Sequence, residues 1–321
     1  MPGAVRSLSG HTEPPMSTAF LFPGQASQFV GMGKDLYDAS PVAKRVFDLA
    51  DGVLDIPIKS FCFGGPEESL RQTAVTQPAV FTHSIAALEM LRDKGIQPDI
   101  VAGHSVGELA ALVAAGVLEI EDGLRLVSVR AQAMSAASKT RQGSMAAIIG
   151  LEDDEVRSVC DEAKSVGLVN PANFNCPGQT VISGEERGVS RAMEIARGKG
   201  AKRTLELPVS GAFHSDLMKP AVDALRGALE GITFSPPSIP VVPNVTAEPT
   251  SDPDELKRLL IEQVVSPVRW TESIVSIIKM GADRAIEVGP GDTLKGLVRR
   301  IDKELVVESA GNIEDFQKDE T

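Results

Sequence analysis

The sequence has few cysteines, no long apolar run and fewer basic than acidic residues. Its three cysteines, Cys62, Cys160 and Cys176, are far apart and form no CxxC pair, so neither a disulfide framework nor a zinc site is expected. No apolar run approaches the roughly 18 residues that span a bilayer. The formal net charge of -12 argues against general binding to nucleic acid or to a membrane surface. These absences favour a protein of the reducing cytoplasm, in which an anionic ligand would be met by local basic groups.

The first 17 residues also lack the apolar segment of a signal peptide, and they contain a single arginine. We interpret residues 1–17 as a tag or a disordered leader, with Met16 as a possible natural start. The rest of the 321-residue chain, with 42% hydrophobic residues overall, is long enough for one large core or two linked domains.

The motif Gly-His-Ser-Val-Gly at residues 103–107 is the feature around which the chain is organised. Apolar residues 100–102 precede it, and a helical pattern follows it, so a strand, a tight turn and a helix are predicted. A serine flanked by glycines on such a turn is typical of a nucleophile elbow, which exposes the hydroxyl of Ser105. The alternative is a glycine-rich turn of any doubly wound protein, which the motif alone does not exclude.

A serine nucleophile needs a base, most often histidine, and the chain has four histidines. His11 lies in the leader, and His83 lies in a helical run where a half-buried or surface structural role is expected. The side chain of His104 should project away from that of Ser105. Elimination leaves His214, in a glycine-containing loop, as the base.

The group that would orient the imidazole is less clear from the sequence. Asp283 and Glu287 are weak candidates, and a backbone carbonyl would serve the same purpose.

Arg130 lies on the apolar stripe of a helix predicted over about residues 121–138, between Val127 and Met134. A buried arginine must be paired or must face an anion. Alternatively, its stem covers apolar surface while its guanidinium reaches water. The sequence pattern leaves both readings open.

The predicted element order divides the chain into two parts of an α/β protein. Residues 139–207 show the order βαββαβ, which predicts an inserted ferredoxin-like subdomain. We expect residues 18–138 and 208–309 to form an α/β-hydrolase-like core with a parallel sheet, and residues 310–321 to form a polar tail that is frayed from Asn312. Within the core we expect a helix from Pro78 to Asp93 and a pair of strands over residues 239–245.

Seven sequence features, in order, resemble those of the bacterial malonyl-CoA:acyl carrier protein transacylases, from about Thr18 to Ile301. They are residues 22–28 (Phe-Pro-Gly-Gln-Ala-Ser-Gln), residues 103–108, Arg130, residues 143–147, residues 173–179, residues 211–215 and residues 287–291.

This resemblance implies catalytic roles for five residues. Ser105 would be the acylated nucleophile and His214 the general base. The backbone carbonyl of Gln263 would orient the histidine, and the N–H groups of Gln25 and Val106 would form the oxyanion hole.

The resemblance also implies a substrate site. Arg130 would clamp the malonyl carboxylate, which favours the functional reading of this residue. Asn173 and Asn175 match positions near the cleft. One departure is Ala26, where the family usually has glycine, and it constrains the loop beside the oxyanion hole.

The implied activity is transfer of a malonyl group from malonyl-CoA to the phosphopantetheine thiol of acyl carrier protein, through a malonyl-serine, for fatty acid biosynthesis. Malonyl-CoA is then a substrate, so we expect no cofactor and no metal, and we expect a monomer. The alternatives are a discrete malonyl acyltransferase of a polyketide pathway, a serine ester hydrolase, and a non-catalytic scaffold that binds a carrier protein. A hydrolase has no reason to carry Arg130 on a buried stripe, and a scaffold has none to keep both Ser105 and His214.

Overall fold

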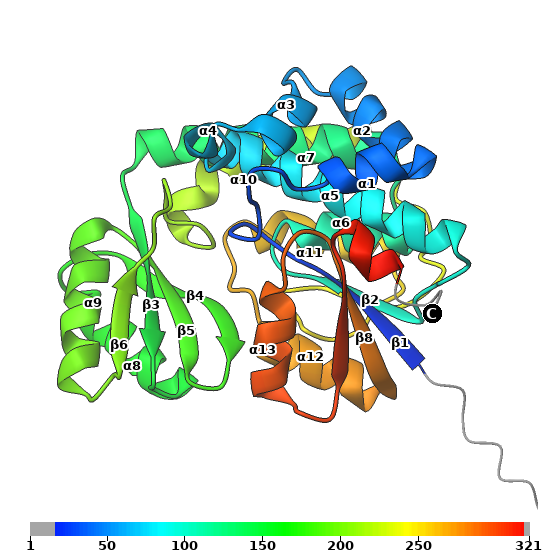
Figure 1. Ribbon diagram of the computed structural model, residues 1–321. Helices are drawn as coiled ribbons and strands as arrows, with labels where there is room; N and C mark the ends of the chain where they lie inside the picture. The colour runs from blue at the N-terminus through cyan, green and yellow to red at the C-terminus, as the bar shows by residue number, and fades with distance from the viewer. Residues whose placement is uncertain (1–16, 318–321) are drawn as a thin grey trace, which may run out of the picture.

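A computed structural model of the chain describes residues 17–317, so the predicted leader, apart from its last residue, lies outside the described part. The molecule has a larger part and a smaller part, each built on its own sheet (Figure 1). This arrangement confirms the predicted fold class, a parallel-sheet α/β core with a small inserted antiparallel sheet.

The larger part holds a five-stranded sheet in the order β7-β2-β1-β8-β9, in which all paired strands run parallel. Its strands are β1 (Ser17–Phe22), β2 (Ile100–Gly103), β7 (Val241–Val242), β8 (Ala282–Val288) and β9 (Val306–Ala310).

Helices cover both faces of this sheet, and the alternate side chains of β1 therefore enter two different apolar clusters. Phe20 and Phe22 join one apolar cluster, while Ala19 and Leu21 join another with Trp270. The helices of the larger part are α1 (Lys34–Ala39), α2 (Pro41–Val53), α3 (Ile58–Gly64), α4 (Glu67–Leu70), α5 (Thr73–Asp93), α6 (Gly107–Ala114), α7 (Ile120–Thr140), η1 (Asp216–Met218), α10 (Lys219–Glu230), α11 (Pro253–Gln263), α12 (Trp270–Lys279), α13 (Thr293–Ile301) and η2 (Ile313–Phe316).

The smaller part has the sheet order β4-β5-β3-β6 with antiparallel pairs throughout, as a ferredoxin-like unit requires. One face of its sheet packs on two helices, seen to the side of the molecule in Figure 1. The opposite face contributes Met145, Ala147 and Val181 to the core of the larger part. Its elements are β3 (Ser144–Ile149), α8 (Asp153–Ala163), β4 (Val169–Cys176), β5 (Gln179–Gly184), α9 (Glu186–Gly198) and β6 (Arg203–Glu206).

Two element predictions were wrong near prolines. Helix α5 begins at Thr73, five residues before the predicted start, and contains Pro78 in its interior. In the turn before this proline, the Thr76 hydroxyl donates to the carbonyl of Leu70 at 2.6 Å. The expected strand pair over residues 239–245 is the single two-residue strand β7, which pairs with β2. Pro240 and Pro243 flank it and lack the N–H groups that would extend its pairing.

The predicted frayed tail is also wrong for the described residues up to 317. Strand β9 pairs along β8, and the segment after it returns to the core, where Phe316 is buried. Helix α3 was not predicted. His83, expected at the surface or half-buried, is fully buried on α5.

None of the helices within residues 17–317 is long and apolar enough to cross a membrane.

Candidate active site

Ser105 lies in the tight turn that joins β2 to α6. Its φ of 53° is in the left-handed region, which a non-glycine residue rarely adopts. The flanking glycines permit the turn to form: a Cβ on Gly103 would lie 2.0 Å from the backbone of Gly107, and one on Gly107 would lie 2.1 Å from the carbonyl of Phe22. The chain therefore forms the predicted elbow.

His214 is brought to the serine from a loop 109 residues away, with its Nε2 2.8 Å from the Ser105 Oγ. Its Nδ1 lies 2.9 Å from the carbonyl of Gln263 and 3.1 Å from that of Ser266. Carbonyls only accept, so Nδ1 carries the proton, and Nε2 is left as the acceptor for the serine hydroxyl.

The imidazole of His214 is ready to act as a base at neutral pH. Burial, and then the positive charge of Arg130, lower the pKa of His214 to about 3. The two weak acidic candidates for orienting it lie elsewhere. Asp283 is exposed on β8, and the Glu287 carboxylate accepts from the N–H groups of Leu294 and Lys295 at the start of α13.

The guanidinium of Arg130 points into the same site and does not reach water, since the residue is 1% exposed. It donates to the Gln77 Oε1 at 2.5 Å, the Gln263 Oε1 at 2.9 Å and the Ser105 Oγ at 3.2 Å. These three acceptors, two side-chain amides and a hydroxyl, are neutral groups. Burial lowers the pKa of Arg130 to about 10, so the group stays cationic at neutral pH. Glu108, whose pKa burial raises to about 7, is the acid that acts on this cation through its charge, without a hydrogen bond to it. A buried cation whose hydrogen-bond acceptors are all neutral is suited to receive an anionic group beside the serine.

A cavity of about 120 Å³ brings most of the predicted site residues together. Its lining comes from both parts of the molecule and consists of Gln25, Ala26, Gln77, His104, Ser105, Val106, Met134, Met145, Asn173, Leu207, Val209, Phe213 and His214. The loop that carries Gln25 is tied by the Ser27 hydroxyl, which donates to the carbonyl of Gly24 at 2.7 Å. Ala26 has a φ of 83°, so the residue that departs from the family pattern occupies a conformation suited to glycine.

The two predicted asparagines of β4, Asn173 and Asn175, have different contacts in the site. Asn175 has its Oδ1 2.9 Å from the Nε2 of His104, whose ring also meets Trp270 edge-on at 5.4 Å. Asn173 lines the cavity. His104 therefore packs beside the serine as a support, as predicted, but it also forms part of the cavity wall.

Three buried polar residues of the site were missed by sequence reasoning: Gln77 on α5, Glu108 in the first turn of α6, and Asn244 just after β7. The backbone N–H of Asn244 donates to the Glu108 carboxylate, and the Asn244 side chain accepts from the backbone N–H of Ser105. The position of Glu108 directly after the elbow motif is the one feature of the sequence that could have identified it as a site residue. No pattern distinguishes Gln77 or Asn244 in a single sequence.

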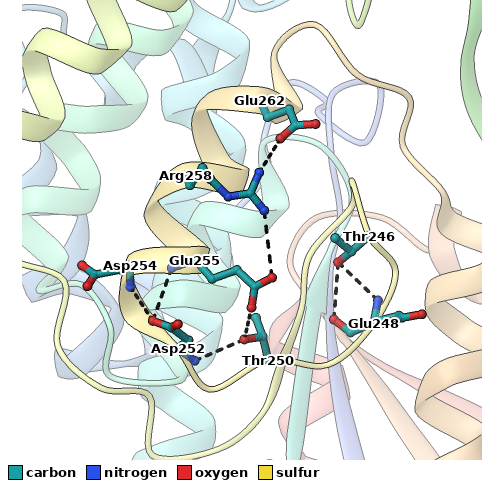
Figure 2. A network of polar contacts seen from close by, with 8 residues as sticks. All are labelled: Thr246, Glu248, Thr250, Asp252, Asp254, Glu255, Arg258 and Glu262. Atoms are coloured by element: carbon teal, nitrogen blue, oxygen red, sulfur yellow. Dashed lines mark hydrogen bonds and ion pairs between the residues drawn. The ribbon is translucent and has the colours of Figure 1, made fainter.

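The last residue of helix α11, Gln263, supplies a carbonyl to His214. Figure 2 shows a network of polar contacts at the start of this helix and along it. Asp252 caps the helix by accepting from the N–H groups of Asp254 and Glu255, and Thr250 donates to the Glu255 carboxylate at 2.6 Å. Along the helix, Arg258 reaches Glu262 at 2.8 Å and Glu255 at 4.0 Å. The network lies on the surface of the helix whose last carbonyl contacts His214.

No group of three or more His, Cys, Asp or Glu side chains within residues 17–317 is arranged to hold a metal ion.

The fold and the site define an acyl-transferring serine enzyme: a serine in a nucleophile elbow, a histidine within hydrogen-bond distance of it, and a buried arginine that faces the nucleophile. The family profile described as "Acyl transferase domain" matches residues 19–321. The chain is 47% identical over 288 residues to a malonyl CoA-acyl carrier protein transacylase of Bacillus subtilis, which covers 89% of this chain and 91% of that protein.

Solved structures agree with the sequence comparison. An acyl carrier protein S-malonyltransferase from Vibrio cholerae superposes with a TM-score of 0.91 at 42% identity, covering 94% of this chain and 99% of that one. A malonyl-transacylase solved in complex with a type II PKS acyl-carrier protein gives 0.90 at 40% identity, covering 93% and 97%. The chain belongs to the acyl transferase domain family and, within it, to the malonyl-CoA:acyl carrier protein transacylases.

Proposed function

We propose that this protein transfers a malonyl group from malonyl-CoA to the phosphopantetheine thiol of acyl carrier protein, for fatty acid synthesis. The observation that carries the proposal is the Arg130 guanidinium, buried and bound only to neutral acceptors, 3.2 Å from the nucleophile oxygen. An acyl group that bears its own carboxylate supplies the missing anion, whereas an acetyl group does not. The names of the relatives support the same substrate and carrier.

In the first half-reaction, His214 Nε2 takes the proton of the Ser105 hydroxyl as the Oγ attacks the thioester carbonyl carbon of malonyl-CoA. The oxyanion is held by the N–H groups of Gln25 and Val106, both in the cavity lining. When the C–S bond breaks, the imidazolium returns the proton to the leaving thiolate of coenzyme A. The product is a malonyl ester on Ser105.

In the second half-reaction the same groups run in reverse order. The thiol of the carrier's phosphopantetheine gives its proton to His214, and its sulfur attacks the ester carbonyl. The ester C–O bond breaks, and the proton returns to the Ser105 Oγ. Arg130 holds the malonyl carboxylate through both steps. Asn173 forms part of the cavity wall, and Asn175 supports His104, another residue of that wall.

A second cavity gives the thiols a route to the serine. This groove of about 260 Å³ shares Gln25, Ala26, Leu207 and Val209 with the nucleophile cavity and extends to Phe29 and Arg71 at the surface. We place the pantetheine arms of both substrates in it. We also propose that the chain divides into a core (residues 18–138 and 208–309) and an insert (139–207). We propose further that the protein is a monomer. Light scattering after gel filtration tests the oligomeric state.

The two non-transferase alternatives lack support from the site. An ester hydrolase does not need a buried arginine beside the nucleophile, and a scaffold does not need the 2.8 Å Ser105–His214 contact. A polyketide-pathway malonyltransferase remains the second candidate, because one relative was solved with a type II PKS carrier. Competition between fatty acid and polyketide carriers for the malonyl-enzyme distinguishes the two.

Intact-protein mass spectrometry tests the proposal. With malonyl-CoA alone we expect one malonyl adduct, on Ser105 and absent from Ser105→Ala. Addition of holo acyl carrier protein should move the adduct to the carrier. An adduct that never forms, or that passes only to water, refutes the transferase proposal.

A further inference from the structure

Asn244 lies directly behind the nucleophile turn, although nothing in the reaction described above uses it. The residue follows β7, the edge neighbour of β2, and is fully buried. Its Oδ1 accepts the backbone N–H of Ser105 at 2.7 Å, and its Nδ2 donates to the carbonyl of Gly103 at 2.6 Å. One side-chain amide therefore bridges the peptide groups on both sides of His104, across the turn.

The backbone of Asn244 is itself held on both sides. Its N–H donates to the Glu108 Oε2 at 2.7 Å, and its carbonyl accepts from the N–H of Arg269 at 3.1 Å. Glu108 is 1% exposed and sits in the first turn of α6, the helix that the elbow opens. Hence the amide cannot rotate or shift without breaking contacts that are buried and hard to replace.

A second amide holds the other peptide group of Ser105. The Gln263 Nε2 donates to the Ser105 carbonyl at 3.1 Å, while the Gln263 Oε1 accepts from Arg130. Both backbone groups of a residue with a φ of 53° are thus engaged by buried side-chain amides.

We infer that Asn244 is a positioning residue for the acyl-transfer reaction, which holds the serine turn in its left-handed conformation and keeps the Ser105 N–H out of the oxyanion hole. The inference rests on the proposed function, because it concerns the serine that carries the ester. In serine proteases of the chymotrypsin type the nucleophile's own N–H is an oxyanion donor. Here that N–H is committed to Asn244, so the oxyanion falls to Gln25 and Val106. Glu108 acts through Asn244 by accepting its backbone N–H.

Single-turnover loading separates positioning from folding. Loss of folded protein lowers the amplitude of malonyl-serine formation, whereas a misplaced nucleophile lowers the rate constant of the folded fraction. For Asn244→Ala we expect the rate constant at saturating malonyl-CoA to fall about 100-fold, the size of effect that a nucleophile displaced by about 1 Å produces, with little change in the concentration that gives half-saturation.

Thr180→Val is the matched control, because it removes a side-chain hydrogen bond of another fully buried polar residue, from the Thr180 hydroxyl to the Asp153 carboxylate at 2.6 Å, in the smaller part. It should lower the melting temperature and leave the loading rate constant at its wild-type value. A loading rate constant for Asn244→Ala equal to that of Thr180→Val overturns the inference.

The pair Glu108→Ala and Glu108→Gln tests the mode of action. Glutamine keeps an acceptor for the Asn244 N–H, so Glu108→Gln should recover most of the rate constant that Glu108→Ala loses. Equal losses would mean that the charge of Glu108 acts directly and not through Asn244. If wild-type protein forms no malonyl ester at all, the proposed function fails instead, and the two failures are told apart.

Discussion

At the scale of single residues, burial and the charge of Arg130 together determine the ionisation of His214. His214 is neutral at physiological pH because it is buried and lies near a cation, and its two carbonyl partners fix the proton on Nδ1. In the proposed reaction Arg130 is the counter-charge of the substrate carboxylate, and after burial its charge is the second cause of the low pKa of His214. One side chain thus links acyl selectivity to the ionisation of the base.

A pH profile tests this link. Acetyl-CoA is the substrate for this profile, because its acyl group has no carboxylate that could interact with Arg130. The pKa of His214 is lowered to about 3 in the free enzyme. We therefore expect that kcat/KM for loading does not fall between roughly pH 8 and pH 5. Removing the cation in Arg130→Ala makes protonation of His214 easier, so its pKa rises and the acid limb moves to higher pH.

Arg125→Ala is the control for this profile, since Arg125 lies on the exposed face of the same helix, paired with Glu121 and Asp122. Its profile should overlay that of the wild type. An acid limb near pH 6.5 in the wild type would show that the base is an ordinary histidine.

Ala26 carries local strain that a single substitution should relieve. Its φ of 83° costs an L-residue about 1–2 kcal/mol, partly offset by the greater unfolded-state entropy of glycine. Ala26→Gly should therefore raise the free energy of unfolding by about 0.5–1 kcal/mol in urea titrations.

The same exchange in a helix should have the opposite sign. Ala224, exposed in α10, is the control, and Ala224→Gly should lower stability by about 1 kcal/mol. Loss of stability in both variants would contradict the strain at Ala26.

At the scale of secondary-structure elements, the C-terminal segment is part of the core. The N–H of Ile313 donates to the Asp35 carboxylate of α1 at 2.7 Å, and Phe316 is 5% exposed. This segment covers β9, the edge strand of the large sheet.

Phe316→Ala should therefore cost about 3–5 kcal/mol of unfolding free energy. Phe29, 48% exposed on the loop after β1, is the matched phenylalanine, and Phe29→Ala should cost about 0.5 kcal/mol or less. Similar small costs in the two variants, measured by urea unfolding, would mean that the segment is dispensable.

The elements predicted well are those whose apolar pattern is local. The elbow strand is a short apolar run, and the six elements of the smaller part alternate apolar stretches with glycine, proline or charged residues. Strand β7 and the C-terminal segment owe their structure to distant partners, β2 and α1, which a local pattern does not show. The same limit applies to the site. Ser105 and His214 follow from a motif and from a short supply of histidines, whereas Asn244 acquires its role from residues 136 to 141 positions away.

At the scale of the whole molecule, the site is assembled from both parts. The larger part supplies Ser105, His214 and Arg130, and the smaller part closes the cavity with Met145 and Asn173. The closure leaves about 120 Å³ beside the nucleophile and limits the acyl groups that can be held there. In the proposed reaction, the buried cation selects, among the small acyl groups, one that carries a carboxylate.

Competition between two acyl donors tests this selection most directly. The enzyme is mixed with equal concentrations of malonyl-CoA and acetyl-CoA, quenched within one turnover, and the acyl group on the Ser105 peptide is identified by mass. We predict a malonyl ester on the wild-type protein and on Arg125→Ala, and a predominantly acetyl ester on Arg130→Ala. An acetyl ester on the wild type, or the same ratio of esters with and without Arg130, would contradict the account.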